Sequence, residues 1–174
     1  LGSTDYISYS DVSGANVAFA LDKDIYVSTD SGKAFTKVYT GAAGAQITSL
    51  KFSNEGDRVA FGLLPKAGGK NTAKSVDLKG QDEKDLFTSS SAGVFISSWS
   101  TGKNKVVYQE GCYNCDGPRT GTFVYDTSSN KNTEIISGVK GFDLNAVVAS
   151  DDFTKVTYVE STANPNLAGE ALDG

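Results

Sequence analysis

An all-β fold built from a repeated unit is predicted for this chain by three observations. Helix-forming residues are sparse, and no long stretch repeats its apolar residues with the helical period. Short runs of alternating apolar and polar residues are separated by turn-forming residues, as in antiparallel sheets. A motif of serine, valine and an aromatic residue recurs along the chain. The length of 174 residues, with 39% hydrophobic residues, suits one domain over residues 1–174.

The recurring motif joins a strand that ends in serine to a second strand that reads Val-x-aromatic. Its copies are 7–10 with 17–19, 50–53 with 59–61, 98–100 with 106–108, and 148–150 with 156–158. The anchoring serines are Ser10, Ser53, Ser100 and Ser150, at intervals of 43, 47 and 50 residues. This is close to the blade period of a β-propeller, about 40 to 50 residues.

Each unit continues with two more strands and a Gly-rich connector. Third strands are predicted at 25–27, 75–78 and 123–126, and fourth strands at 35–38, 85–88 and 133–136. The predicted fold is therefore an all-β, β-propeller-like arc of about 3.5 four-stranded antiparallel blades. The blades are expected at 5–44, 45–93 and 94–141, with a partial blade at 142–174. A β-sandwich also has short, evenly spaced strands, but it has no reason to repeat this motif.

Residues 52–61 read Phe-Ser-Asn-Glu-Gly-Asp-Arg-Val-Ala-Phe and resemble the FSPDG-x-x-[IV]-A-[FY] signature of TolB-type, WD40-like propeller repeats. Residues 24–27 and 122–126 are similar to the DIYVMD third strand of that family. The resemblance covers nearly the whole chain and implies a propeller fold with protein partners; it says little about activity. The chain departs from the family in lacking proline after the serine and in having fewer than six blades.

Residues 28–35 are close to the Asp-box, S-x-D-x-G-x-[ST]-[WF], with alanine in place of the hydroxyl residue. The resemblance implies a structural turn. Asp30 is expected to bond nearby backbone N–H groups, Gly32 to adopt a positive φ, and Phe35 to pack into the blade. Asp-boxes occur in sialidases and in many non-catalytic propellers, so this turn does not indicate catalysis.

Cys112 and Cys115, the two cysteines of the chain, lie in a loop rich in glycine and asparagine. They could form half of a zinc site, a redox dithiol or a small disulfide. A zinc site needs two further Cys or His ligands, which the chain does not have. A redox dithiol generally begins a helix, where the thiol pKa is lowered. A disulfide is therefore the favoured interpretation, and it implies an oxidising compartment.

The residue types present argue against catalysis. The absence of His removes Ser-His-Asp and Cys-His chemistry. Arg58 and Arg119 are too few for the three arginines of a sialidase-like site. The acidic pair at 151–152 is expected to be solvated or to cap a turn. The pair within 22–24 lacks the further ligands that calcium requires. We expect a non-enzyme with no cofactor and no metal.

Binding is expected on one face of the arc. In a propeller, the connections from strand two to three and from strand four to one share a face. The two-to-three connections lengthen along the chain, to 65–73, 110–121 and a tail from 161, and such loops often carry function. The alternative is that they are tolerated insertions. The candidate binding residues there are Lys66, Lys70, Tyr113, Asn114 and Arg119.

Charge and composition narrow the partners and the compartment. The net charge of −5, with scattered cations, argues against nucleic acid. No run is long and apolar enough to span a membrane. The chain contains no Met, which suggests removal of an N-terminal segment, and no Asn-x-Ser/Thr sequon, which favours a prokaryotic source. We expect an extracellular, periplasmic or cell-surface protein.

Three functions are compatible with these observations. The favoured one is a non-catalytic binding or scaffolding propeller segment that contacts a protein partner or the remainder of a larger chain, with a glycan also open. The others are the propeller portion of a larger secreted hydrolase (a peptidase or a glycosidase), and a structural subunit of a surface layer or filament. The unclosed arc is expected to be completed by a continuation of the polypeptide or by a neighbouring subunit, with a four-bladed ring as the alternative. The aromatic residues expected to be largely buried between blades are Phe19, Phe61, Trp99, Tyr108 and Tyr158.

Overall fold

The structure, a computed structural model, describes residues 7–66, 70–89, 93–111, 121–137 and 142–162, and its regular elements there are all β-strands. The strands are β1 (Ile7–Ser13), β2 (Asn16–Leu21), β3 (Asp24–Ser28), β4 (Thr36–Thr40), β5 (Gln46–Phe52), β6 (Arg58–Leu64), β7 (Asn71–Asp77), β8 (Lys84–Ser89), β9 (Val94–Ser100), β10 (Lys105–Glu110), β11 (Gly121–Asp126), β12 (Lys131–Ser137), β13 (Phe142–Ala149) and β14 (Val156–Thr162).

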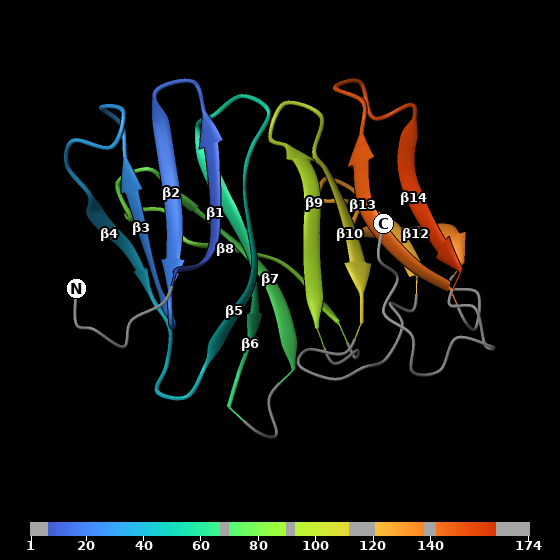
Figure 1. The fold of residues 1–174 in the computed structure, drawn as a ribbon, viewed down its shortest axis with the longest axis horizontal. Coiled ribbons are helices and arrows are strands. Elements are labelled where there is room, and N and C mark those ends of the chain that lie inside the picture. Colours follow the sequence, from blue (N-terminus) through green and yellow to red (C-terminus); the bar gives the residue numbers. More distant parts are fainter. Residues whose placement is uncertain (1–6, 67–69, 90–92, 112–120, 138–141, 163–174) are drawn as a thin grey trace, which may run out of the picture.

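The strands form sheets strictly in chain order, which confirms the predicted all-β arc of antiparallel blades. Three sheets have four strands, β1–β4, β5–β8 and β9–β12, and β13 pairs with β14. The first strands of the sheets, β1, β5, β9 and β13, follow one another in a row, and neighbours in this row are in contact (Figure 1). We refer to the four sheets as blades one to four.

The Val-x-aromatic motif recurs because its residues face two different blades. Side chains alternate across a strand, so Val59 and Phe61 point to one face of β6 and Ala60 to the other. Val59 and Phe61 belong to the cluster shared with blade one, whereas Ala60 belongs to the cluster shared with blade three. Blade two therefore turns its large residues toward the preceding blade and a small residue toward the next.

Three of the five predicted core aromatics are buried as expected, namely Phe61, Trp99 and Tyr108. The prediction for Phe19 was wrong, because it is only half-buried. Phe19 lies on the face of blade one that points away from blade two, where it stacks on Tyr26 with ring centroids 5.2 Å apart. The side chain of Tyr158 lies outside the described residues.

The anchoring serines close the turn between the first and second strands. Ser53 Oγ accepts from the backbone N–H of Asp57 at 3.1 Å and donates to the Asp57 carboxylate at 2.7 Å. Ser150 Oγ likewise accepts from the N–H of Lys155 at 3.1 Å. The register corrects the first copy of the motif: Ser13, not Ser10, pairs with the start of β2. The turn between the first two strands is shorter in blade one than in the other blades. The sequence alignment therefore assigned the anchoring serine three residues too early.

The loops that connect the strands lie on two opposite faces of the arc, and backbone hydrogen bonds join loops of the same face. On one face, the N–H of Gly41 in a four-to-one connector donates to Lys23 O at 2.9 Å, in a two-to-three turn. On the other, the N–H of Ser31 in a three-to-four turn donates to Ala15 O at 2.9 Å, in a one-to-two turn. We call these the connector face, at the bottom of Figure 1, and the turn face, at its top.

Candidate functional site

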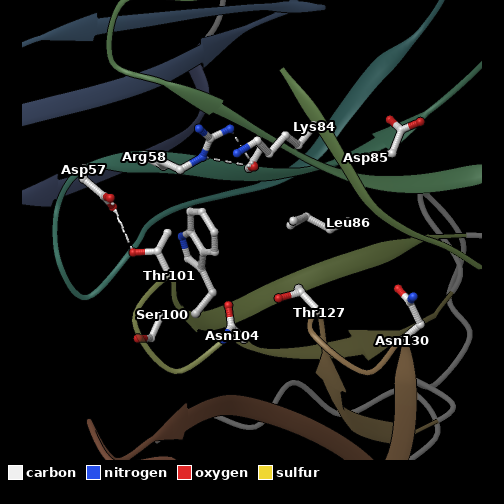
Figure 2. A pocket seen from close by; sticks show the side chains of 12 residues that line it. Asp57, Arg58, Lys84, Asp85, Leu86, Ser100, Thr101, Asn104, Thr127 and Asn130 are labelled. Carbon is white, nitrogen blue, oxygen red and sulfur yellow. Dashed lines mark hydrogen bonds between the residues drawn. The ribbon is translucent and has the colours of Figure 1, made fainter. Parts of the chain in front are cut away.

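A cleft of about 520 Å³ opens between blades two and three, near the turn face (Figure 2). Blade two contributes its one-to-two turn and the start of β8, and blade three contributes both of its turns. The lining residues are Asp57, Arg58, Ser75, Lys84, Asp85, Leu86, Trp99, Ser100, Thr101, Asn104, Thr127 and Asn130. Most of these carry hydroxyl, amide or charged groups, so the cleft suits a polar ligand.

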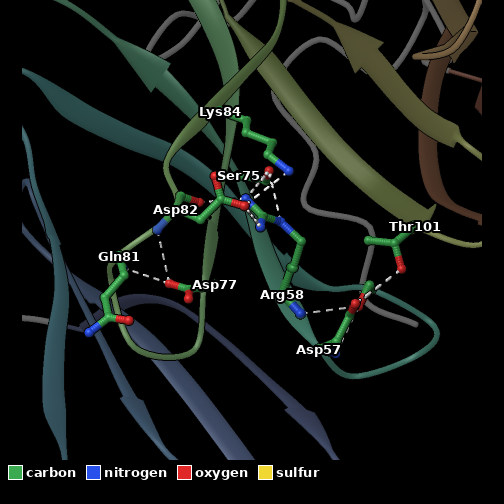
Figure 3. Close-up of polar contacts among 9 residues, drawn as sticks. Asp57, Arg58, Ser75, Asp77, Gln81, Asp82, Lys84 and Thr101 are labelled. Carbon is green, nitrogen blue, oxygen red and sulfur yellow. Dashed lines mark hydrogen bonds and ion pairs between the residues drawn. The ribbon is translucent and has the colours of Figure 1, made fainter.

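Arg58 is the most constrained cation of the cleft. It begins β6 directly after the turn that Ser53 closes. Its guanidinium donates to Ser75 Oγ at 3.1 Å, to the Asp82 carboxylate at 2.7 Å and to Asp82 O at 2.6 Å (Figure 3). Lys84 Nζ approaches the same carboxylate at 3.0 Å. The Asp82 carboxylate thus pairs with both Arg58 and Lys84 on the blade-two side of the cleft.

The two cations keep Asp82 ionised. Hydrogen bonds from Lys84 and then from Arg58 lower the pKa of the Asp82 carboxyl below its usual value. On the opposite side of β8, Lys74 Nζ lies 2.8 Å from Glu83 and 2.5 Å from Asp85. Although burial opposes it, these hydrogen bonds raise the pKa of the Lys74 ammonium. Charged side chains are therefore paired on both sides of β8, and those on the cleft side are Arg58, Asp82 and Lys84.

Glu55 and Thr101 join the turns of the two blades. The carboxylate of Glu55 accepts from Ser100 Oγ, from the N–H of Thr101 at 2.9 Å and from the N–H of Gly102 at 3.1 Å. Burial of the Glu55 carboxyl acts to raise its pKa, but these hydrogen bonds outweigh it and lower the pKa to about 2. Thr101 Oγ1 also donates to Asp57 at 3.2 Å. These contacts join blades two and three beside the cleft.

Trp99 seals the base of the cleft. Only 3% of its surface is exposed, and its indole N–H donates to Lys51 O, on blade two, at 3.1 Å. The Trp99 ring therefore packs between the blades, and little of its surface is accessible for stacking on a ligand. Asn104 and Thr127, at the turns of blade three, are linked by a backbone hydrogen bond of 2.9 Å. The polar wall on this side is thus also fixed.

The described residues hold no group of three or more His, Cys, Asp and Glu side chains placed to bind a metal ion. Asp24, in the acidic pair weighed for calcium, has its carboxylate 2.8 Å from Lys37 Nζ. Asp152 caps its turn: it accepts from Ser150 Oγ at 2.6 Å and from the N–H of Thr154 at 3.0 Å. These bonds lower the pKa of the Asp152 carboxyl to about 2. In the part of the chain that is described, no helix is long and apolar enough to cross a membrane.

The cleft lies on the face opposite the predicted binding loops. Lys66 and Lys70 are exposed at the connector face. Lys66 lies over the connector between blades one and two, where a methyl group added to Gly44 would be 3.1 Å from its Cδ. The remaining candidates, Tyr113, Asn114, Arg119 and the cysteines Cys112 and Cys115, lie outside the described residues. Neither lysine is among the residues that line the cleft.

The cleft residues themselves were missed by the sequence reasoning, which weighed Arg58 only as one of too few arginines. A signal was present. Arg58, Asp57 and Glu55 all follow an anchoring serine, and the structure brings this turn against the equivalent turn of the next blade. The sequence analysis favoured the connector face because its loops are long, whereas the cleft is formed near the turn face, where the turns are short.

The Asp-box-like segment forms a structural turn. The Asp30 carboxylate accepts from the N–H groups of Lys33 at 3.1 Å and Ala34 at 3.0 Å. A hydrogen bond from Ser28, followed by those from the backbone, lowers the pKa of the Asp30 carboxyl. Gly32 has a φ of +84°, which glycine adopts without strain. Phe35 does not enter the core: it is 42% exposed and covers Phe19 edge-on, with ring centroids 5.0 Å apart.

No family model and no curated protein matches this chain. Solved structures do match. An oligogalacturonate lyase of Vibrio parahaemolyticus is similar with a TM-score of 0.62 and 11% identity, over 83% of this chain and 42% of that one. A chain of the nidogen/laminin complex reaches a TM-score of 0.66 at 10% identity, over 91% and 58%. The β-propeller domain of the trilobed protease of Pyrococcus furiosus reaches 0.50 at 16% identity, over 75% and 42%.

These similarities concern the fold. The neighbours are β-propeller proteins, which agrees with the repeat read from the sequence. Identities of 10–16% carry no information about ligands. The chain spans about half the length of these three neighbours.

Proposed function

We propose that this chain is a non-catalytic binding and scaffolding segment of a propeller, whose cleft between blades two and three receives a polar segment of a protein or a glycan. The observation that carries this proposal is the fixed polar lining of the cleft. Arg58 is held by Ser75 and Asp82, and Thr101 is held by Asp57. A site whose side chains are already ordered loses little conformational entropy on binding.

The titration of the carboxyl groups supports a binding role over a catalytic one. A general acid at neutral pH needs a raised carboxyl pKa. Where a carboxyl pKa is shifted in this cleft and its rim, as at Glu55 and Asp82, it is lowered by donors. These groups stay charged at neutral pH and serve as hydrogen-bond acceptors and ion-pair partners.

The proposal includes an oxidising compartment, outside the cell, in the periplasm or on the cell surface, and it rests on the pairing of Cys112 with Cys115. The expected result of thiol labelling under denaturing, non-reducing conditions is no modification at either position. A matched sample reduced beforehand should take up two labels. Labelling of both cysteines without reduction would remove the support for this compartment.

A second candidate is the propeller portion of a larger hydrolase or lyase. It is favoured by the similarity to an oligogalacturonate lyase and to a protease propeller domain, each covered over 42% of its length. The catalytic residues would then lie outside these 174 residues. A native polypeptide much larger than 18.2 kDa would favour this candidate, and a native mass near 18.2 kDa would rule it out.

The binding proposal can be tested with printed arrays of oligosaccharides and of peptides, probed with the 174-residue chain. Thr127→Trp should fill the cleft and reduce binding of any hit by at least about tenfold, the equivalent of roughly 1.4 kcal/mol. The matched control is Lys66→Glu with Lys70→Glu on the connector face, which should leave binding unchanged. Circular dichroism must show both variants folded.

Two results would count against this function. Loss of binding in the Lys66→Glu, Lys70→Glu variant alone would move the site to the connector face, where the sequence placed it. Turnover of an arrayed glycan or peptide by the purified chain would replace binding by catalysis.

A further inference from the structure

The blade-two wall of the cleft has a local excess of positive charge. Arg58 and Lys84 share the carboxylate of Asp82, at 2.7 and 3.0 Å. The Lys84 side chain is 58% exposed, whereas that of Arg58 is 12% exposed, so Lys84 presents the excess charge to solvent. The carboxylate of Asp57, at the far end of the cleft in Figure 2, accepts hydrogen bonds from hydroxyl groups of both blades. An anionic group of a ligand therefore has a partner at Lys84.

The blade-three wall is uncharged and presents the side chains of Asn104, Thr127 and Asn130, which follow one another along the cleft (Figure 2). No described residue hydrogen-bonds to the side chains of Asn104 and Thr127. Asn130 accepts from the hydroxyl of Tyr125 at 2.9 Å through Oδ1, which leaves its NH₂ group for a ligand. A side-chain amide offers an acceptor and two donors, the same kinds of group as a peptide bond. This wall therefore suits the main chain of a polypeptide.

The two amides are positioned by the backbone. Asn104 and Asn130 have φ values of +54° and +53°, a region that asparagine adopts more readily than most residues. They end equivalent four-residue turns, which begin at Thr101 and Thr127. The amides are therefore held at the cleft by the shape of their turns and are ordered before a ligand arrives.

The strand β8 borders the cleft with its main chain as well as its side chains. Lys84, Asp85 and Leu86 are consecutive lining residues, although alternation along a strand turns Asp85 to the other side, where it meets Lys74. Among the described strands β8 is the edge of its sheet, and Leu86 has no register partner on β7. An edge strand offers main-chain N–H and C=O groups to an added strand. This also favours a polypeptide in extended conformation.

The cleft has no aromatic ring available for a sugar. Trp99 is the aromatic residue among those that line it, and it is 3% exposed. A sugar ring generally packs its apolar face on the large flat surface of an aromatic side chain. The amide groups and the strand edge therefore favour a peptide over a glycan.

Permanent contacts between the described blades are of a different kind. Blades one and two meet through a cluster of apolar residues that includes Leu50, Val59 and Phe61. Surfaces that stay buried are more apolar than surfaces that bind a partner and release it. The cleft combines an exposed lysine with amides that have hydrogen-bonding capacity left. This lining favours a separate protein over a permanent covering by more of the same polypeptide.

We propose that the cleft binds an extended acidic segment of another protein. A glutamate or aspartate of the segment pairs with Lys84, and its main chain lies between β8 and the amides of Asn104 and Asn130. This inference rests on the proposed function, because it names the class of ligand that the cleft receives. Since Lys84 is exposed, its ion pair selects among peptides and weakens as salt is added.

The test uses an array of short peptides of varied sequence, probed with the 174-residue chain beside the oligosaccharide array. The peptides that bind should be enriched in Asp and Glu. Resynthesis of each hit with Asn and Gln in place of Asp and Glu should weaken its binding. Methylation of the main-chain nitrogens of a hit should also weaken it, because the peptide then loses its N–H donors.

Lys84→Glu should reduce the affinity for acidic hits by at least about tenfold, because like charges then face each other. The same variant should bind the lysine analogues of these hits better than the wild-type chain does. Lys33→Glu is the matched control. Lys33 is also exposed on the turn face, but on blade one, so its replacement makes the same change in net charge outside the cleft and should leave binding unchanged.

Asn104→Gly should weaken the acidic hits about fivefold, since it removes one amide while glycine keeps the positive φ. Its control is Asp22→Gly, which changes an exposed residue with a φ of +54° on the connector face and should leave binding unchanged. Circular dichroism of each variant checks its fold.

The outcomes separate this inference from the proposed function. Hits that are mainly neutral or basic, or acidic hits that bind Lys84→Glu as well as wild type, would overturn the acidic segment. A glycan hit that is lost in Thr127→Trp, without any peptide hit, would overturn it as well and leave the proposed function standing. Absence of any hit on both arrays would count against both.

Discussion

At the aromatic position of the repeated motif, the same type of residue has different surroundings in different blades. Phe61 is fully buried between blades one and two, where its ring lies 4.5 Å from that of Tyr39. Phe19, at the equivalent position, is half-buried. The same residue type is buried where a preceding blade packs against it and half-buried where no described blade does.

Replacement of Phe61 by alanine should therefore be costly. Phe61→Ala is expected to reduce the free energy of unfolding by about 3–5 kcal/mol, because the lost contacts leave a cavity that the two sheets cannot fill. Urea denaturation followed by circular dichroism measures this change. Phe35→Ala, at a position that is 42% exposed, is the control and should cost about 1 kcal/mol or less. Equal losses in the two variants would contradict the assigned core.

Glu55 should make stability depend on pH in the acid range. Its folded pKa is about 2, against an ordinary value of 4.5, so its contribution is complete above about pH 4.5 and is lost as the pH falls toward 2. Because the side chain is exposed and screened by solvent, we expect about 1 kcal/mol. The difference in unfolding free energy between the wild-type chain and Glu55→Gln should shrink over this range. A difference that is constant from pH 6 to 2.5 would show that the carboxylate does not link the blades.

Among the elements, β6 shows how closely the inner strands approach one another. A methyl group on Gly62 would lie 2.1 Å from Val94 O and 2.3 Å from Thr48 Oγ1. The same region contains a buried polar contact: Ser49 Oγ accepts from the N–H of Ile96 at 2.9 Å, and Thr48 Oγ1 donates to Val94 O at 2.6 Å. The inner strands of blades two and three thus lie close together, and the hydroxyl groups of Thr48 and Ser49 on β5 hydrogen-bond to the backbone of β9.

Gly62→Ala should separate these strands, since two of the closest atoms belong to the backbone and a short side chain. We expect a loss of about 3 kcal/mol or more in unfolding free energy, comparable to overpacking of a core. Gly14→Ala is the comparison, because no atom lies within 4 Å of a methyl group there and only its φ of +60° is strained. It should cost about 1 kcal/mol. Thermal or urea unfolding of both variants gives the comparison, and a smaller effect at Gly62 than at Gly14 would refute the close approach.

For the whole molecule, the arc consists of sheets that stack through their faces and meet at their first strands (Figure 1). In blades two and three the inner strands β5 and β9 are well covered, and the three four-stranded sheets end in the edge strands β4, β8 and β12. Stability should follow this order, because the inner strands can open only if two blades separate, whereas an edge strand can detach alone.

Native-state hydrogen exchange should therefore show graded protection. Backbone amides of β5, β6 and β10 should exchange only through global unfolding, and those of β4, β8 and β12 should exchange faster through local opening. The described blades should otherwise unfold in one transition. A separate, earlier transition of blade one would show that its contacts with blade two are too weak to couple them.

The repeat could be predicted from the amino-acid sequence, and with it the strands, their antiparallel order and most of the buried aromatic residues. These follow from local patterns, since period-two alternation and turn residues act over a few positions. The alignment of Ser10 failed because only the pairing of Ser13 with Asn16 reveals that the first turn is shorter.

Which faces of the sheets are covered, and where a cleft forms, depends on how the blades pack and could not be predicted from the sequence. The motif around Arg58 reads as an ordinary turn, and it becomes the wall of a cleft only when the next blade brings Thr101 and Asn104 against it. Likewise, Val12 and Phe52 both read as core residues, yet one is 64% exposed and the other 5%. The physical reason is that alternation along a strand specifies that a side chain leaves one face of the sheet, while its burial depends on what lies against that face.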